Sequence, residues 1–233
     1  MSQHEPVSYK IIFLDVDGVL NNTSIPHEIS HCIVQRIGRL VKSIGASIVI
    51  SSTWRLREKH REAVKRIFLQ CGVSMPISST PYIKTTSYKK TRVDEILTWL
   101  YLNSTNMCQE ERFNRELKQR KEFVAADFIL PVSIHVSHFV VLDDINLMKE
   151  GGKDHPLITE QHFVRTVMRV GFTETNEEQA TYILEGDYNK SITPPKYCEH
   201  CHTYMINGYD LELNKYFCTN QCQREFYNCF ITV

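Results

Sequence analysis

Residues 11–21 decide the fold, and they read Ile11-Ile12-Phe13-Leu14-Asp15-Val16-Asp17-Gly18-Val19-Leu20-Asn21. The first four residues belong to a short hydrophobic run, which is typical of a buried parallel strand. Two carboxylates then follow with one residue between them, and Gly18 permits a sharp turn. The stretch therefore predicts a strand that delivers Asp15 and Asp17 to the carboxyl edge of an α/β sheet, where such sheets bind their ligands.

The two carboxylates suggest two different chemical roles. An aspartate at the end of a buried strand can bind a hard cation and can also attack phosphorus as a nucleophile. A second aspartate two residues later can reach a leaving-group oxygen and act as a general acid. The alternative is a strand that ends in an ordinary Asp-Gly turn without any chemistry.

Length and composition limit the possible classes of protein. The 233 residues suffice for one medium domain and a small appendage. The 27 basic and 27 acidic residues cancel, so the global charge favours neither nucleic acid nor a membrane surface as partner. Met1–Lys10 lacks the apolar core of a signal peptide, and no run has the length of a transmembrane helix. We therefore expect a cytoplasmic or nuclear protein with no membrane partner.

Two later segments repeat the pattern of an apolar strand that ends in polar side chains. Residues 46–50 are followed by Ser51, and residues 136–142 are followed by Asp143 and Asp144. The carboxyl ends of parallel strands share one edge of the sheet, so we expect these side chains to join the first carboxylate pair. The serine hydroxyl could bind a phosphate oxygen or only cap the next helix. The later carboxylates need a cation if they are buried, whereas an exposed turn would need none.

Helices are expected between these strands. Apolar side chains at helical spacing predict helices over residues 30–44, 54–70, 93–101 and 177–185, with a further strand over 164–170. Arg55 and Arg57 open the second helix and could either meet a polyanionic substrate or form a solvated face. Lys90 and Arg92 precede the third helix, where a cation opposes the macrodipole. Either a nearby anion or a solvated basic loop would account for them.

The chain divides by composition into two parts. Residues 103–133 look like a peripheral helical insertion, in which Phe113, Leu117 and Val124 share one face of an amphipathic helix. This insertion could also act as a modest lid. Residues 191–196 have the composition of a linker. We therefore expect a larger domain over residues 1–190 and a small domain over residues 197–233.

The small domain carries a cluster of cysteines with metal-ligand spacing. Cys198 and Cys201 form a C-x2-C pair, and Cys218 and Cys222 form a C-x3-C pair, with sixteen residues between the two pairs. Four thiolates in two tight pairs can close a tetrahedral zinc site. The segment is too short to build a sizeable core unaided, so a structural metal is expected to stabilise it. Disulfide pairing, or a histidine ligand from His200 or His202, is the alternative.

This cysteine cluster resembles the treble-clef-like zinc fingers of the TRASH and MYM type. The segment Phe217-Cys218-Thr219-x-x-Cys222 matches their aromatic-Cys-Ser/Thr-x-x-Cys turn. The resemblance implies a structural zinc and a binding surface but does not identify the partner, which could be protein or nucleic acid.

The larger domain resembles the haloacid dehalogenase (HAD) phosphohydrolase superfamily. Residues 14–19 match its first motif, Ser51 its second, and Asp143-Asp144 its fourth. Arg92 and Lys90 compete for the cation of the third motif, and Arg92 is favoured because it directly precedes the apolar helix positions. The superfamily implies an α/β, Rossmann-like three-layer sandwich with a central, mostly parallel sheet, here with a minimal cap.

A closer similarity is to the HAD domain of Swiss army knife RNA repair proteins. It spans roughly residues 9–186. It is carried by Asp-Gly-Val-Leu-Asn at 17–21, Ser-Ser-Thr-Trp-Arg at 51–55, Arg92 with Glu95-Ile96, Trp99-Leu100, Leu142-Asp143-Asp144, and Gly171-Phe172-Thr173.

The resemblance implies a mechanism. Magnesium would be bound by Asp15, the backbone carbonyl of Asp17 and Asp144, with Asp143 supporting them. Asp15 would attack phosphorus and form an aspartyl-phosphate, while Asp17 would serve as general acid and then as general base. Ser51 and either Arg92 or Lys90 would hold the phosphoryl oxygens.

The function expected from this resemblance is that of a hydrolase, a magnesium-dependent phosphatase. A site without a large cap would admit a phosphomonoester on a macromolecule, either a polynucleotide end or a phosphoprotein. One alternative is a small-molecule phosphatase or nucleotidase with the 103–133 insertion as lid. Another is a non-catalytic module in which the zinc finger binds a partner and the HAD domain is a scaffold.

Overall fold

The structure is a computed structural model. It describes residues 8–21, 28–83, 88–106, 123–124, 129–147, 158–187, 209–210 and 215–216. The chain folds as two compact units, Met1–Tyr188 and Asn189–Val233. In the second unit the described residues form one antiparallel pair, β8 (Tyr209–Asp210) with β9 (Lys215–Tyr216). The four predicted zinc ligands, Cys198, Cys201, Cys218 and Cys222, lie outside the described residues.

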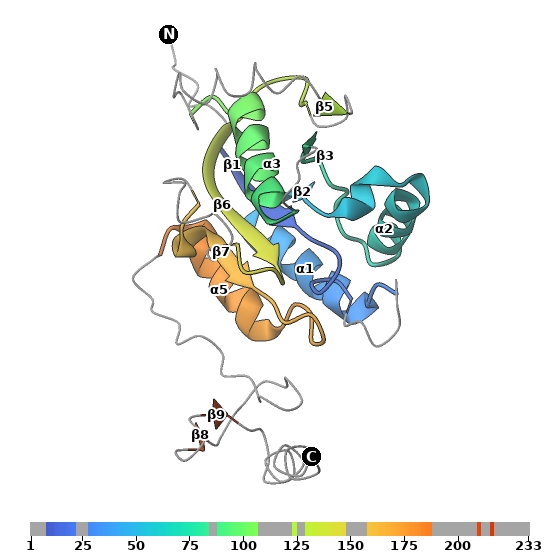
Figure 1. Ribbon diagram of the computed structural model, residues 1–233, viewed down its shortest axis with the longest axis vertical. Coiled ribbons are helices and arrows are strands. Elements are labelled where there is room, and N and C mark those ends of the chain that lie inside the picture. Colours follow the sequence, from blue (N-terminus) through green and yellow to red (C-terminus); the bar gives the residue numbers. More distant parts are fainter. Residues whose placement is uncertain are drawn as a thin grey trace. The chain divides into compact units, whose positions relative to one another are not determined.

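The first unit is built on a five-stranded sheet of order β3-β2-β1-β6-β7 (Figure 1). The strands are β1 (Ser8–Leu14), β2 (Ala46–Ile50), β3 (Ser78–Ser79), β6 (His135–Asp143) and β7 (Phe163–Arg165). Each neighbouring pair in this sheet is parallel. Leu14 pairs with Ile50 on one side and with Leu142 on the other, so three strands end level with one another. The predicted parallel sheet is therefore confirmed, with β1 at its centre.

Strand alternation divides the core into two layers. Ile12 and Leu14 pack on one face of β1, and Ile11 and Phe13 pack on the other. The first face is covered by α1 (His31–Ile44), α2 (Glu58–Gln70) and α5 (Glu174–Glu185). The second face is covered by α3 (Tyr88–Asn103) (Figure 1). Because parallel strands are buried on both faces, these strands read as continuous apolar runs in the sequence. The result is the expected three-layer α/β sandwich.

Several elements differ from their predicted bounds. The helix predicted over 54–70 is split into a 3-10 turn, η1 (Thr53–Leu56), and α2, because Arg57 between them is extended at φ −120° and ψ 127°. The strand predicted over 164–170 ends at Arg165, because the chain turns after Thr166: the N–H groups of Val170 and Gly171 both donate to the Val167 carbonyl. A second short 3-10 turn, η4 (Glu160–His162), leads into this strand.

The predicted helical insertion is wrong at Val124. That residue lies in β5 (Phe123–Val124), which pairs with β4 (Tyr82–Ile83) in an antiparallel ribbon. Backbone pairing with a distant strand therefore replaces the local helix at this point. Phe113 and Leu117 lie outside the described residues. Among the described helices, none has both the length and the apolar character needed to cross a membrane.

Candidate active site

Three carboxylates from two strands meet at the carboxyl edge of the sheet. Asp15 follows β1, Asp143 ends β6, and Asp144 comes next along the chain. One oxygen from each lies within 4.8 Å of the others. The Asp15 backbone N–H donates to the Leu142 carbonyl at 3.0 Å, which fixes the nucleophile candidate against β6. The predicted convergence of these segments is therefore present in the fold.

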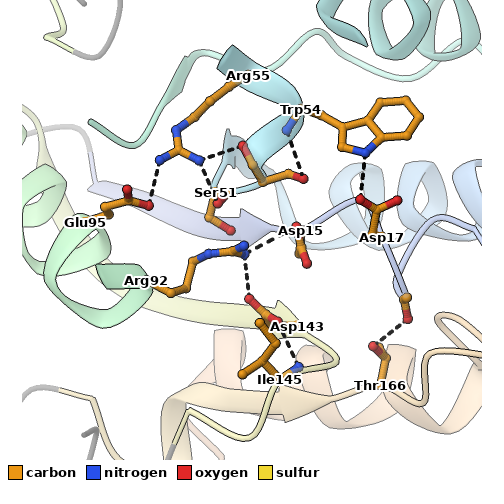
Figure 2. Close-up of polar contacts among 12 residues, drawn as sticks. Asp15, Asp17, Ser51, Trp54, Arg55, Arg92, Glu95, Asp143, Ile145 and Thr166 are labelled. Carbon is orange, nitrogen blue, oxygen red and sulfur yellow. Dashed lines mark hydrogen bonds and ion pairs between the residues drawn. The ribbon is translucent and has the colours of Figure 1, made fainter. Parts of the chain in front are cut away.

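A guanidinium from α3 joins these carboxylates. Nη1 of Arg92 lies 2.7 Å from Oδ2 of Asp143 and 3.3 Å from Oδ1 of Asp15 (Figure 2). All three side chains are buried, and Arg92 is 4% exposed. The side chain of Lys90 lies outside the described residues. Of the two cations considered for this position, Arg92 is the one that the described structure places in the site.

The electrostatics of the cluster favour a further cation. Burial raises the pKa of Asp143 to about 8, with Asp15 adding to the rise, whereas Arg92 and the Ile145 N–H lower it. Burial also raises the pKa of Asp144, and the negative charges of Asp15 and Asp17 add to that rise. Three clustered carboxylates thus face one guanidinium. Carboxylate oxygens are the ligands that magnesium prefers, so this donor set fits a hard divalent cation.

Gly18, in the turn that follows Asp15 and Asp17, lies close to Asp144. Its φ is +74°, a conformation that side chains with a Cβ rarely adopt. A Cβ at this position would lie 2.6 Å from Cγ of Asp144. The Thr166 hydroxyl donates to the Gly18 carbonyl at 2.8 Å and holds the turn from the side of β7. Nothing in the sequence pointed to Thr166, because its role depends on a contact between residues 148 positions apart.

Asp17 lies in a different environment from Asp15. Its Oδ2 accepts a hydrogen bond from Trp54 Nε1 at 2.8 Å, and its Oδ1 accepts one from Asn21 Nδ2 at 2.8 Å (Figure 2 shows the Trp54 contact). The sequence reasoning did not assign a role to Trp54 or Asn21. Both stand in the stretches that carry the family resemblance, and that was the only signal available for them.

Ser51 presents an unused hydroxyl at the same edge. The residue is fully buried, and its backbone N–H donates to Leu14 at 2.9 Å. Its Oγ has no hydrogen-bond partner within the described residues. The hydroxyl that caps the following turn belongs instead to Ser52, which accepts from the Trp54 N–H at 3.3 Å. Ser51 is therefore not the cap, and its Oγ remains available for a ligand.

Arg55 does not face a substrate, contrary to one reading of the sequence. The residue is buried, and its Nη2 pairs with Glu95 Oε2 at 2.6 Å. The Arg55 guanidinium also donates hydrogen bonds to four backbone carbonyls, those of Thr80 at 2.8 Å, Ser51 at 3.1 Å, Ser52 at 2.6 Å and Pro81 at 2.9 Å. Arg55 thus holds the loop after β2, whereas Arg57 is exposed.

The comparisons with known proteins agree with this geometry. Residues 11–176 match the family model described as the HAD domain in Swiss Army Knife RNA repair proteins. No curated protein and no solved structure matches the chain. The matched segment covers more than half of the chain, includes Asp15 and Asp144, and ends inside α5. The chain therefore belongs to the family of HAD domains found in Swiss Army Knife RNA repair proteins.

Proposed function

We propose that the protein is a magnesium-dependent phosphohydrolase that acts on a phosphomonoester through an aspartyl-phosphate intermediate. The observation that carries the proposal is the meeting of Asp15, Asp143 and Asp144 with Arg92 beside the Ser51 hydroxyl, which has no hydrogen-bond partner among the described residues. Membership of the HAD family supports a phosphohydrolase. The magnesium requirement and the substrate are our proposals.

The carboxylates would hold the metal, and each side chain has a role in the chemistry. Asp15 and Asp144 would bind magnesium together with the Asp17 carbonyl, with Asp143 supporting them; when bound, the cation neutralises charge on the transferring phosphoryl group. A carboxylate oxygen of Asp15 attacks phosphorus as the bond to the leaving oxygen breaks. Asp17 donates a proton to that oxygen and then takes one from the water that attacks the aspartyl-phosphate. This second step releases inorganic phosphate and restores Asp15.

Two groups are suited to hold the phosphoryl oxygens during transfer. Arg92 is already directed at Asp15 from α3, and Ser51 offers a hydroxyl donor directly after β2. Such donors stabilise charge that moves onto the phosphoryl oxygens in the transition state. Residues 21–30 are too few for a large cap domain, which favours a bulky substrate such as a polynucleotide end or a phosphoprotein.

We also propose that the second unit is a zinc-binding domain that docks protein or nucleic acid. Its support is the spacing of Cys198, Cys201, Cys218 and Cys222, together with the antiparallel pair of β8 and β9 between the two cysteine pairs. The division of the chain at Tyr188 is close to the proposed linker at residues 191–196. A cytoplasmic or nuclear location suits free thiolates as zinc ligands.

The test of the main proposal uses the full chain and an aryl phosphate such as p-nitrophenyl phosphate. We expect hydrolysis only with magnesium, and we expect Asp15→Asn to abolish it. Asp187→Asn, after the end of α5, is the matched control and should retain activity. Turnover that survives Asp15→Asn would overturn the mechanism. A panel of phosphorylated oligonucleotides, phosphopeptides and nucleotides then identifies the substrate class.

A further inference from the structure

Both oxygens of Asp17 are held by groups that can only donate. Trp54 Nε1 lies 2.8 Å from Oδ2, and Asn21 Nδ2 lies 2.8 Å from Oδ1. An indole has a donor and no acceptor, and an amide nitrogen likewise only donates. The carboxyl group is therefore fixed in rotation by two bonds from opposite ends. Each oxygen retains a further lone pair that can carry a proton.

The orientation of the Asn21 amide is dictated by the same loop. Its Oδ1 accepts the backbone N–H of Gly18 at 2.8 Å, and the residue is 2% exposed. A flipped amide would place two N–H groups against that backbone N–H. The amide nitrogen must therefore face Asp17, and the assignment of this donor follows from the hydrogen-bond pattern.

The Trp54 indole is held in place by its own surroundings. The residue is 2% exposed, and its ring packs on His60 with the centroids 4.6 Å apart. Its backbone N–H is capped by Ser52, and the next residue, Arg55, is anchored by buried contacts to Glu95 and to four carbonyls. The indole N–H thus projects from a rigid turn onto Asp17 (Figure 2).

We propose that Trp54 and Asn21 are positioning residues that aim the Asp17 carboxyl at the leaving-group oxygen. The inference rests on the proposed function, which gives Asp17 the proton transfer. Its effect depends on the leaving group. An alkoxide must receive a proton as it departs, whereas nitrophenolate departs readily without one. A misdirected Asp17 carboxyl therefore slows the hydrolysis of alkyl phosphate esters more than that of p-nitrophenyl phosphate.

The test compares the same substitution at the chain's two tryptophans. Trp54→Phe removes the donor to Asp17. Trp99→Phe is the matched control, because Trp99 is also buried but donates to Ser78 at 3.0 Å. The readout is kcat/KM for p-nitrophenyl phosphate and for glycerol 2-phosphate with magnesium, since this ratio reports the steps up to phosphoryl transfer.

We expect Trp54→Phe to lower kcat/KM for glycerol 2-phosphate about tenfold more than for p-nitrophenyl phosphate. Trp99→Phe should change both values by the same factor. Equal losses on both substrates in Trp54→Phe, or no loss, would overturn the inference while leaving the phosphatase proposal intact. A wild-type protein that hydrolyses neither ester with magnesium would instead overturn the proposed function.

A second readout detects the contact itself without turnover. In Trp99→Phe the only tryptophan is Trp54, so its fluorescence reports the group at its indole N–H. We expect Asp17→Leu in this background to shift the emission, whereas Asp94→Leu on α3 should not. A Trp54 emission that does not shift in Asp17→Leu would show that the contact between Trp54 and Asp17 is absent in solution and would overturn the inference.

Discussion

Asp15 and Asp17 are two residues apart, yet their surroundings differ. Asp15 is buried among two other carboxylates and the Arg92 guanidinium. Asp17 is half-buried and accepts hydrogen bonds from two uncharged donors. A side chain next to a cation site suits attack on phosphorus, and a side chain held by neutral groups suits proton transfer. The environment rather than the residue type would separate the two proposed functions.

Gly18 is the residue at which a single methyl group should disturb the cation site. In Gly18→Ala the new Cβ would lie 2.6 Å from Cγ of Asp144, so this carboxylate must move. We expect the magnesium concentration for half-maximal activity to rise about tenfold, because displaced ligands lose affinity. Titration of activity against magnesium measures the change.

The control for this prediction is Gly45→Ala. Gly45 ends α1 with a similar φ of +69°, but in the described part of the chain nothing lies within 4 Å of the position that its Cβ would take. Gly45→Ala therefore introduces the same backbone strain as Gly18→Ala, about 1 kcal/mol, without a steric clash of the new Cβ. An equal rise in the magnesium requirement in both variants would count against a direct contact of Gly18 with a metal ligand.

The buried ion pair of Arg55 and Glu95 joins three elements around the site. Arg55 bonds the loop after β2, Glu95 belongs to α3, and Oε1 of Glu95 accepts the Ile83 N–H at 3.2 Å from β4. Burial raises the pKa of Glu95, and the adjacent Arg55 lowers it. Glu95 follows Arg92 by nearly one helical turn, so the pair sets the position of α3 relative to Ser51.

Removing one charge of this pair should cost far more than removing one from a surface pair. We expect Glu95→Gln to lower the free energy of unfolding by about 3 kcal/mol, because it leaves Arg55 buried without its partner. Glu177→Gln is the control, since Glu177 is partly exposed and pairs with Arg39 at 3.1 Å and with Arg36 at 3.8 Å, and it should cost less than about 1 kcal/mol. Urea unfolding measures the free energy of unfolding of both variants. Comparable losses would contradict the expectation that the buried pair of Arg55 and Glu95 matters more for stability than the surface pair.

Sequence patterns predicted the central strands because β1, β2 and β6 contain apolar runs that are followed directly by polar residues. The same reasoning brought Asp15, Ser51 and the Asp143-Asp144 pair to one edge. This reasoning did not predict that Arg55 is buried, because its partner Glu95 lies forty positions away in the chain and is not visible in the local composition. It failed for Val124 because pairing with β4 overrides local helical periodicity.

The two units of the chain should separate in function. The family match ends at residue 176, within the first unit. We therefore expect a chain that stops at Tyr188 to keep its hydrolysis of p-nitrophenyl phosphate, because every residue assigned to the chemistry precedes that point. A truncated chain that folds by circular dichroism but is inactive would contradict this division.

The zinc content of the full chain provides the complementary test. We expect Cys198→Ser with Cys201→Ser to remove zinc, measured by atomic absorption. Cys32→Ser with Cys71→Ser is the matched control and should keep it, because those two cysteines lie in the first unit and are free thiols. Retention of zinc in the first double variant would count against these ligands.

The sheet order has a consequence for the newly made chain on the ribosome. A nascent chain that has paired β1 with β2 already carries Asp15 and Ser51, but the remaining carboxylates arrive only when β6 inserts on the other side of β1. Such long-range pairing forms late because a long loop must close first. Magnesium capture would therefore mark the moment at which translation has supplied β6, before β7 completes the sheet.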